Sequence, residues 1–289
     1  MIGITGASGQ LGSGILKLLV GKIPPKDIVA VTRTPAKVAA FSAQGATIRT
    51  GDFDVPGGLL PAFRGIEKLL IIPTSDLRTG VRRKQHCAAV RAAVGAGVHH
   101  IIYLSTVGAR PGPDLFDTHF STEMALFELA TVWTVIRMSL YADNLLAVLP
   151  RAVTSGTYAA PDAAPVAYVS RDNVAALAAG ILATPGHENV TYYATGPRAV
   201  TQEEVAAAAA KASGRPVSHV PITPEQLRQG LVEAGLSAGA IRVYLDIQEA
   251  MRTGAFDMVS GDMARLAGRP AESLDAFLDR NSKVLTPAP

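Results

Sequence analysis

The sequence predicts an α/β fold built on a doubly wound parallel sheet, with a smaller C-terminal α/β lobe. Short, almost continuously apolar runs alternate with helical stretches in the first half of the chain, as in parallel sheets covered by helices on both faces. The first apolar run leads directly into a glycine-rich turn that opens a helix. After residue 145 the alternation loosens, which predicts a first domain over 1–145, with returning segments near 166–196, and a second over 146–289 that is mostly helical after residue 200.

Each predicted strand is rich in β-branched residues, and several predicted helices begin at a capping residue. Thr34 and Pro35 offer an N-cap and a proline at the first helical position, so a helix is predicted there. Ser170 can cap another helix, and Thr201 with Glu204 has capping-box spacing. The predicted strands are residues 2–5, 27–32, 46–49, 68–72, 98–104, 131–136 and 190–194, and the clearest predicted helices are 10–21, 81–96 and 170–183.

Composition and charge exclude several classes of function and of site. The chain has 289 residues, 48% of them hydrophobic, and a formal net charge of only +3 that is scattered along the sequence. We therefore expect a large core and no nucleic-acid partner. The single cysteine excludes an internal disulfide and a Cys-based zinc site, and no metal site is predicted. No signal peptide is recognised and no apolar run reaches the ~18 residues of a membrane span, so we expect a cytoplasmic protein with no membrane partner.

The glycine turn after the first strand predicts a dinucleotide site. Glycine at the first position permits the tight turn, at the second lets the backbone approach a pyrophosphate, and at the third lets the helix pack close to the strand. The helix N-terminus then faces the phosphates with its partial positive charge. A structural turn without a ligand is the alternative. The residues of this stretch predicted to bind the cofactor are Gly6, Ser8, Gly9, Gln10, Leu11 and Gly12.

The end of the second predicted strand indicates which dinucleotide is bound. Enzymes that use NAD usually place an acidic residue here to accept from the ribose 2′-hydroxyl. This strand ends in Arg33, no carboxylate is present, and Lys37 follows one helical turn later. A guanidinium can form a fork with a phosphate, so the sequence predicts NADP(H), although both cations could also be solvated surface charges.

Two further strand ends are expected beside the cofactor. After the third strand, Asp52 could bond the adenine amine while Phe53 packs near the ring, or Asp52 could simply cap its loop. Pro73, Thr74 and Ser75 follow the fourth strand at the same edge of the sheet. All five residues are predicted to bind the cofactor.

Candidate catalytic groups follow the fifth strand. Ser105 and Thr106 are expected at the nicotinamide end. In short-chain dehydrogenases a serine here holds the substrate oxygen, and the next helix carries Tyr-x-x-x-Lys. The corresponding helix here presents His119 and Glu123 on one face. We therefore expect the usual proton relay to be absent, and His119 either to be catalytic or to be a helix-terminal histidine paired with Glu123.

The loop after the sixth strand carries the last two candidates. Tyr141 and Asn144 lie where the chain should pass the nicotinamide, so both are predicted to be pocket groups. A structural turn with a packed tyrosine is the alternative.

Several of these residues together resemble the NmrA-like atypical short-chain dehydrogenases, and within them the type 2 quinone oxidoreductases and triphenylmethane reductases. The resemblance implies an NADPH-binding Rossmann domain, a smaller lobe, and reduction of quinones or other conjugated acceptors. Met138, Ser139 and Leu140 depart from the quinone reductase pattern, as do Pro73 and Thr74. The resemblance rests on Thr5–Gly12, Arg33, Pro35–Lys37, Gln85, His86, Ala96–Val98, His119, Glu123, Arg137, Tyr141, Asn144, Gly186, His187 and Gly254–Asp257.

The combined expectation is an NADPH-dependent reductase that transfers hydride to a quinone, a dye or a similar small-molecule acceptor, as a monomer or homodimer. A ketone, enone or imine reductase on the same fold is the first alternative, and it would need a firm proton donor. The second is a non-catalytic NADP(H) redox sensor, because NmrA-like proteins include regulators that bind dinucleotide without turnover.

Overall fold

The structure is a computed structural model that describes residues 1–78 and 80–286. These residues form two compact units. The first contains residues 1–138, 174–193 and 265–269, and the second contains 139–173, 194–264 and the residues from 270 onward. The domain division predicted near residue 145 stays a prediction, and its last residues, 287–289, lie outside the described part.

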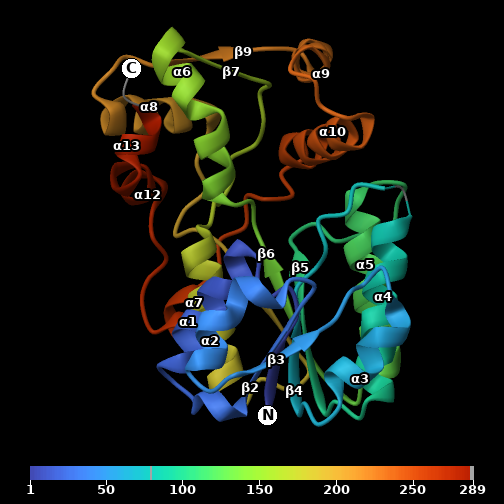
Figure 1. Ribbon diagram of the computed structural model, residues 1–289. Coiled ribbons are helices and arrows are strands. Elements are labelled where there is room, and N and C mark those ends of the chain that lie inside the picture. The colour runs from blue at the N-terminus through green and yellow to red at the C-terminus, as the bar shows by residue number, and fades with distance from the viewer. Residues whose placement is uncertain (79, 287–289) are drawn as a thin grey trace. The chain divides into compact units, whose positions relative to one another are not determined.

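A seven-stranded sheet forms the centre of the first unit (Figure 1). Its order is β3-β2-β1-β4-β5-β6-β8, and the pairs from β3 through β6 are parallel. All five residues of β2 are buried, as expected for a strand covered on both faces. The strands are β1 (Ile2–Ile4), β2 (Ile28–Thr32), β3 (Thr47–Thr50), β4 (Lys68–Ile71), β5 (His100–Thr106), β6 (Val132–Met138) and β8 (Val190–Ala194).

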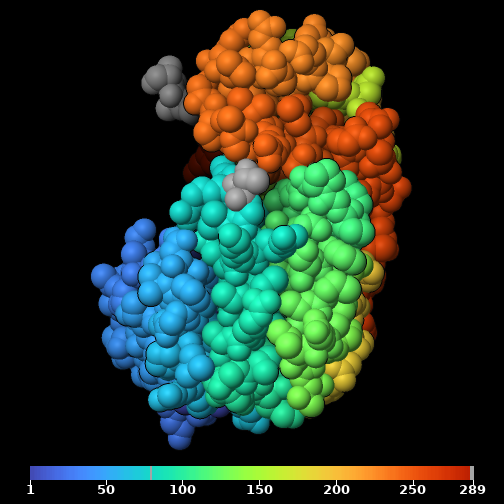
Figure 2. Space-filling model, turned by 90° about the vertical axis from the view of Figure 1, so that its right-hand side faces the viewer, coloured from blue at the N-terminus to red at the C-terminus, as the bar shows by residue number. Residues whose placement is uncertain are grey.

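Helices cover both faces of this sheet (Figure 1). One layer holds α1 (Gln10–Val20), α2 (Ala39–Ala43) and α7 (Arg171–Ala183). The other holds α3 (Leu59–Phe63), α4 (Val81–Gly95) and α5 (Leu115–Leu129), and Figure 2 shows α4 in teal lying beside α5 in green. Apolar side chains of these three helices pack on the sheet around Tyr103 and Ile101. The predicted doubly wound α/β fold is confirmed.

The strand order places a topological switch beside β1. This strand pairs with β2 on one side and with β4 on the other, so the connections diverge at its carboxyl end. In open parallel sheets, ligands bind in the crevice formed at such a point. We therefore expect a ligand site among the loops that follow β1, β2, β3 and β4.

Two local expectations differ from the structure. A helical segment does start at Pro35, but it is a 3₁₀ helix (Pro35–Val38) that precedes α2, and the Thr34 side chain does not cap it. The fifth strand begins at His100 and continues to Thr106, which places Ser105 and Thr106 inside the strand. Ser170 does cap α7, because its hydroxyl accepts from the Asn173 N–H.

The second unit is built mainly from helices. It also contains a parallel pair of short strands, β7 (Thr157–Ala160) and β9 (Ser218–Pro221), whose half-exposed residues give no clear alternating pattern. Within the described residues, no helix is long and apolar enough to cross a membrane. The helices of the second unit are α6 (Leu149–Ser155), α8 (Gln202–Ser213), α9 (Pro224–Glu233), α10 (Ala238–Arg252), α12 (Leu274–Arg280) and α13 (Ser282–Leu285). The residues of α11 (Asp262–Ala267) are divided between the two units.

Candidate functional site

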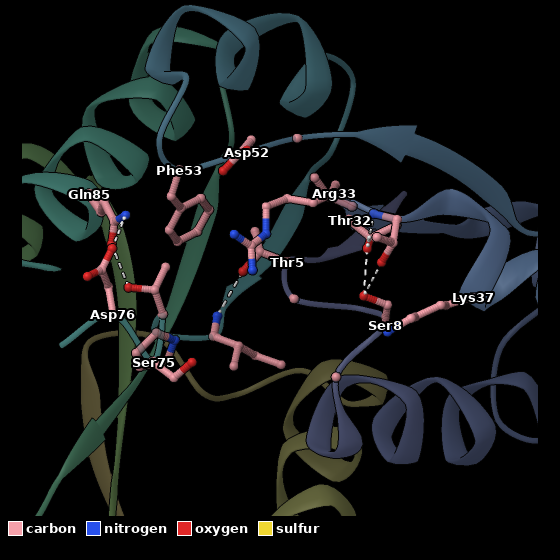
Figure 3. A pocket seen from close by; sticks show the side chains of 18 residues that line it. Thr5, Ser8, Thr32, Arg33, Lys37, Asp52, Phe53, Ser75, Asp76 and Gln85 are labelled. Atoms are coloured by element: carbon pink, nitrogen blue, oxygen red, sulfur yellow. Dashed lines mark hydrogen bonds between the residues drawn. The ribbon is translucent and has the colours of Figure 1, made fainter. Parts of the chain in front are cut away.

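A cavity of about 710 Å³ opens at the carboxyl ends of β1 to β4 in the first unit (Figure 3). Its volume lies within the roughly 300–1,000 Å³ that small-molecule and cofactor sites span. The four loops predicted to bind a dinucleotide all contribute to its wall. The lining residues are Thr5, Gly6, Ser8, Gly9, Val31, Thr32, Arg33, Thr34, Lys37, Gly51, Asp52, Phe53, Ile72, Pro73, Thr74, Ser75, Asp76 and Gln85. Of the residues predicted to bind the cofactor, Gln10, Leu11 and Gly12 are not in this wall.

The turn between β1 and α1 needs glycine for two separate reasons. Gly6 has a φ of +61°, a left-handed conformation that side chains disfavour. A Cβ on Gly12 would lie 2.3 Å from the carbonyl oxygen of Gly6, so the helix can approach the turn only without one. Gly9 offers no side chain to cap α1, which leaves the first N–H groups of the helix directed to a ligand.

Three hydroxyl groups are hydrogen-bonded to one another where the glycine turn lines the cavity. The Thr32 and Thr34 hydroxyls both donate to Ser8 Oγ, over 2.8 Å and 3.1 Å. Because Ser8 Oγ accepts from both threonine hydroxyls, the Ser8 hydroxyl proton is left to donate to a ligand in the cavity. The Thr34 side chain is thus bonded to Ser8, and it makes no capping bond to the 3₁₀ helix that starts at Pro35.

Arg33 and Lys37 are the cations of this end of the cavity. Both are exposed lining residues, and Figure 3 shows the Arg33 side chain pointing into the cavity. Neither forms an ion pair within the described part of the chain. An anion that entered beside Ser8 would therefore meet two uncompensated positive charges.

The loop after β3 forms the opposite wall. Asp52 Oδ1 accepts from the Asp54 N–H over 3.0 Å, so this residue caps its loop while still lining the cavity. Phe53 also lines the cavity and packs against the core cluster beneath it. Contact with the core cluster thus holds one face of the Phe53 ring in place.

Sequence reasoning missed a polar network on this wall. Gln85 Nε2 donates to Asp54 over 2.8 Å and to Asp76 over 3.1 Å, and Gln85 Oε1 accepts from the Thr74 hydroxyl over 2.6 Å. Arg78 bridges the two aspartates, and its hydrogen bonds hold the pKa of Asp76 well below its usual range. The sequence shows an amide side chain at Gln85, near the start of α4, but it does not show that the hydrogen-bond partners of this amide lie on two other loops.

The end of β5 is tied to α5 and β6 by a buried carboxylate. Glu123 is fully buried, and its Oε1 accepts from the Ser105 hydroxyl over 2.5 Å. Arg137 holds the same carboxylate in a bidentate pair, with Nε 3.1 Å from Oε1 and Nη2 on Oε2. The Ser105 proton, predicted to hold a substrate oxygen, is therefore used inside the protein.

Of the two alternatives for His119, the one in which it pairs with Glu123 is wrong. Arg82 Nη2 lies 3.2 Å from His119 Nε2, and a guanidinium can only donate, so the proton of the neutral ring is on Nδ1. That nitrogen donates to the Tyr103 oxygen over 3.0 Å. Both ring nitrogens of His119 are thus occupied, and the side chain is 3% exposed.

His86 completes this buried cluster from the other side. Its Nε2 accepts from the Thr74 N–H over 3.0 Å, so its Nδ1–H points to the Tyr103 oxygen, 3.2 Å away. Burial, together with the Arg82 charge, lowers the pKa of His86 to about 3. Burial also lowers the pKa of His119 well below its ordinary value. Both rings are neutral, and they tie the Thr74 loop to α4 and β5.

The remaining candidates lie in different units. Thr106 is in the first unit, and its hydroxyl donates to the Val107 carbonyl over 3.1 Å. Tyr141 and Asn144 belong to the second unit. There Arg171 lies over the Tyr141 ring, 4.9 Å from its centroid, and donates to Asn144 Oδ1 over 3.1 Å. The Tyr141 hydroxyl makes no hydrogen bond within the described residues, and burial raises its pKa.

Comparison with known proteins places the chain in a family. Quinone oxidoreductase 2 of Escherichia coli K12 is 35% identical over 277 residues, covering 95% of this chain and 96% of the relative. The crystal structure of the E. coli NADPH-dependent quinone oxidoreductase complexed with NADPH superposes with a TM-score of 0.91, at 33% identity over 97% of this chain and 99% of that one. Citrobacter sp. triphenylmethane reductase complexed with NADP(H) gives 0.90, at 31% identity over 98% and 100%. The sequence model of the NmrA-like family matches residues 1–263. The chain therefore belongs to the NmrA-like family.

Proposed function

We propose that this protein is an NADPH-dependent reductase that transfers hydride to a quinone or a similar conjugated acceptor. The observation that carries the proposal is the pair of uncompensated cations, Arg33 and Lys37, beside the Ser8 hydroxyl at one end of the cavity. The relatives named as quinone oxidoreductase and triphenylmethane reductase support the same class of reaction.

The cavity residues fit NADP(H) part by part. The N-terminus of α1 and the Ser8 proton would hold the pyrophosphate, as helix N-termini hold phosphates elsewhere. Arg33 and Lys37 would pair with the 2′-phosphate, for which a guanidinium fork is suited. Phe53 would pack on the adenine and the second oxygen of Asp52 would accept from its amine. Pro73, Thr74 and Ser75 would border the dinucleotide beyond β4.

The groups around β5 favour an acceptor that needs no proton from the enzyme. Both nitrogens of His119 are engaged, and Glu123 is held by Arg137 and Ser105. The bound cofactor supplies hydride, and a quinone that accepts it becomes a hydroquinone anion that can take its proton from water. The protein then contributes orientation rather than acid catalysis.

The acceptor-side groups stay predictions. Thr106, Tyr141 and Asn144 remain the candidates for contact with the acceptor, while both ring nitrogens of His119 are already hydrogen-bonded within the protein. If both Tyr141→Phe and His119→Ala leave turnover intact, no side-chain proton donor among the predicted groups is required. A cytoplasmic location and a monomeric or homodimeric state also stay predictions.

The test is oxidation of NADPH and of NADH against a panel of quinones, triphenylmethane dyes, ketones and enones. Turnover with quinones or dyes and NADPH supports the proposal. Turnover confined to ketones or enones, with an essential acid in the pH–rate profile, would favour the other reductase class. Tight NADPH binding with no turnover across the panel would replace the enzyme with a redox sensor.

A further inference from the structure

Three side chains from separate segments of the second unit meet at one place. Asp162 follows β7, Glu203 lies in the first turn of α8, and His219 lies in β9. One possible ligand atom from each falls within 4.8 Å of the others. The group is distinct from the dinucleotide cavity, which is lined by residues of the first unit.

The orientation of His219 is fixed by a bond outside the cluster. Its side chain is only 2% exposed, and its Nε2 lies 2.9 Å from the carbonyl oxygen of Ala160. A carbonyl can only accept, so Nε2 carries the hydrogen. In the neutral ring Nδ1 is then a bare lone pair, and it points at Glu203 Oε1 across 3.3 Å. Two acceptors that face each other at this distance need either a proton or a metal ion between them.

The backbone around His219 makes this orientation rigid. His219 is paired with Tyr158 in the parallel register of β9 and β7, and Ala160 lies further along the same β7 strand. The Tyr158 and His219 ring centroids are 6.0 Å apart. An imidazole that donates its second N–H to a backbone carbonyl is the usual state of a metal-bound histidine, because that bond fixes the tautomer and orients the ring.

The separation of His219 and Glu203 suits a small divalent ion. Zinc binds histidine nitrogen at about 2.0–2.1 Å and carboxylate oxygen at about 2.0–2.2 Å, which puts neighbouring ligands of a tetrahedral site roughly 3.3 Å apart. His219 Nδ1 and Glu203 Oε1 already have this separation. A nitrogen ligand disfavours Mg²⁺ and Ca²⁺, which take oxygen ligands. Imidazole with carboxylates and no thiolate is a donor set for first-row divalent ions.

We propose that Asp162, Glu203 and His219 bind a divalent transition-metal ion of the Zn²⁺ type. The bound ion joins the N-terminus of α8 to the β7–β9 pair and so clamps this part of the second unit. Because Asp162 and Glu203 are exposed, the fourth position faces solvent and takes water. The competing arrangement is a doubly protonated His219 ring that forms a simple ion pair with Glu203, with no metal affinity.

The experiment is calorimetric titration of the metal-stripped full-length protein with Zn²⁺, repeated with Mg²⁺. The proposal predicts one saturable Zn²⁺ site per chain, no competition by Mg²⁺, and an unfolding midpoint that rises with Zn²⁺ by mass action. Glu203→Gln and Asp162→Asn change exposed side chains, and both keep Glu204, whose carboxylate forms one half of the capping box with Thr201. Each is expected to weaken Zn²⁺ binding by on the order of 100-fold in a metal-free protein that still unfolds cooperatively.

Two further variants make the result specific. His219→Gln removes the nitrogen ligand, and His99→Gln, an exposed histidine outside the cluster, is the matched control that keeps wild-type affinity. Cobalt-loaded wild type should show the visible absorption of a four-coordinate ion, which Glu203→Gln lacks. The absence of a saturable Zn²⁺ site in the wild type, or equal affinity in wild type and Glu203→Gln, would overturn the proposal.

Discussion

Ser105 donates its hydroxyl proton to Glu123 across 2.5 Å, and both side chains are fully buried. This bond lies at the end of β5, where short-chain dehydrogenases use a serine to hold the substrate oxygen. Here the hydroxyl and the carboxylate stabilise each other and, through Arg137, the adjoining end of β6. The Ser105 proton is therefore used within the protein, and a contact between this residue and the acceptor stays a prediction.

Glu123→Ala should be strongly destabilising. The change leaves Arg137, whose side chain is 26% exposed, without its bidentate partner and leaves the Ser105 proton without an acceptor. Removing one partner of a buried ion pair typically costs about 3 kcal/mol or more, and this partly exposed pair belongs at the low end. Denaturant unfolding measures the loss. The matched control is Glu225→Gln, which breaks the exposed pair with Arg228 and should leave the midpoint at the wild-type value.

Ser105→Ala should lower stability more than activity. The hydrogen bond to an ionised carboxylate contributes about 1.5–3 kcal/mol, while no acceptor oxygen depends on this proton in the account given above. We expect a lower unfolding midpoint and a kcat/KM for quinone reduction close to that of the wild type. A folded Ser105→Ala protein with an unchanged midpoint and a kcat reduced by orders of magnitude would restore the catalytic role.

Two glycines of the same helix should respond in opposite ways to alanine. In Gly12→Ala the new Cβ would lie 2.3 Å from the Gly6 carbonyl oxygen, so the phosphate-binding turn must move. In Gly14→Ala the nearest atom outside the helix backbone is a side-chain carbon at 3.5 Å, an ordinary contact. Fluorescence titration with NADPH should show severe loss of affinity for Gly12→Ala only. Gly14→Ala should bind normally and gain about 0.5–1 kcal/mol of stability, and equal effects would contradict the geometry.

The buried histidines should make the protein sensitive to mild acid. Burial lowers the pKa of native His86 to about 3, whereas an unfolded histidine titrates near 6.5. Between these values the unfolded state binds a proton that the native state does not, so stability falls as the pH falls from about 6.5 toward 3. One such histidine contributes a slope of up to about 1.4 kcal/mol per pH unit. Unfolding free energies of wild type and His86→Gln between pH 7 and 5 should differ in slope by up to this amount, and parallel curves would refute the assignment.

The fold and the residues that line the cavity after β1 to β4 could be predicted because their signals are local. A strand, a glycine turn and a helix are consecutive in the sequence, and Arg33 ends the next strand. Gly12 was identified by spacing alone, and the structure adds the contact with Gly6 that requires it.

The chemistry around β5 could not be predicted because its partners come from different elements. The i, i+4 spacing of His119 and Glu123 suggested a pair on one helix face, but each side chain forms its hydrogen bonds with residues of other elements. Arg137 reaches Glu123 from β6, and Arg82 reaches His119 from α4. Helical spacing shows which side chains share a face, but tertiary neighbours decide which of them bond.

Recognition of the 2′-phosphate of NADPH by Arg33 can be measured as kcat/KM for NADPH and for NADH with one quinone. We expect the wild type to prefer NADPH. Arg33→Gln should lower kcat/KM for NADPH by about 10- to 100-fold, the value of one or two charge-assisted hydrogen bonds, while kcat/KM for NADH stays unchanged. A wild type that uses both cofactors equally, or an Arg33→Gln variant that loses both activities in parallel, would contradict it.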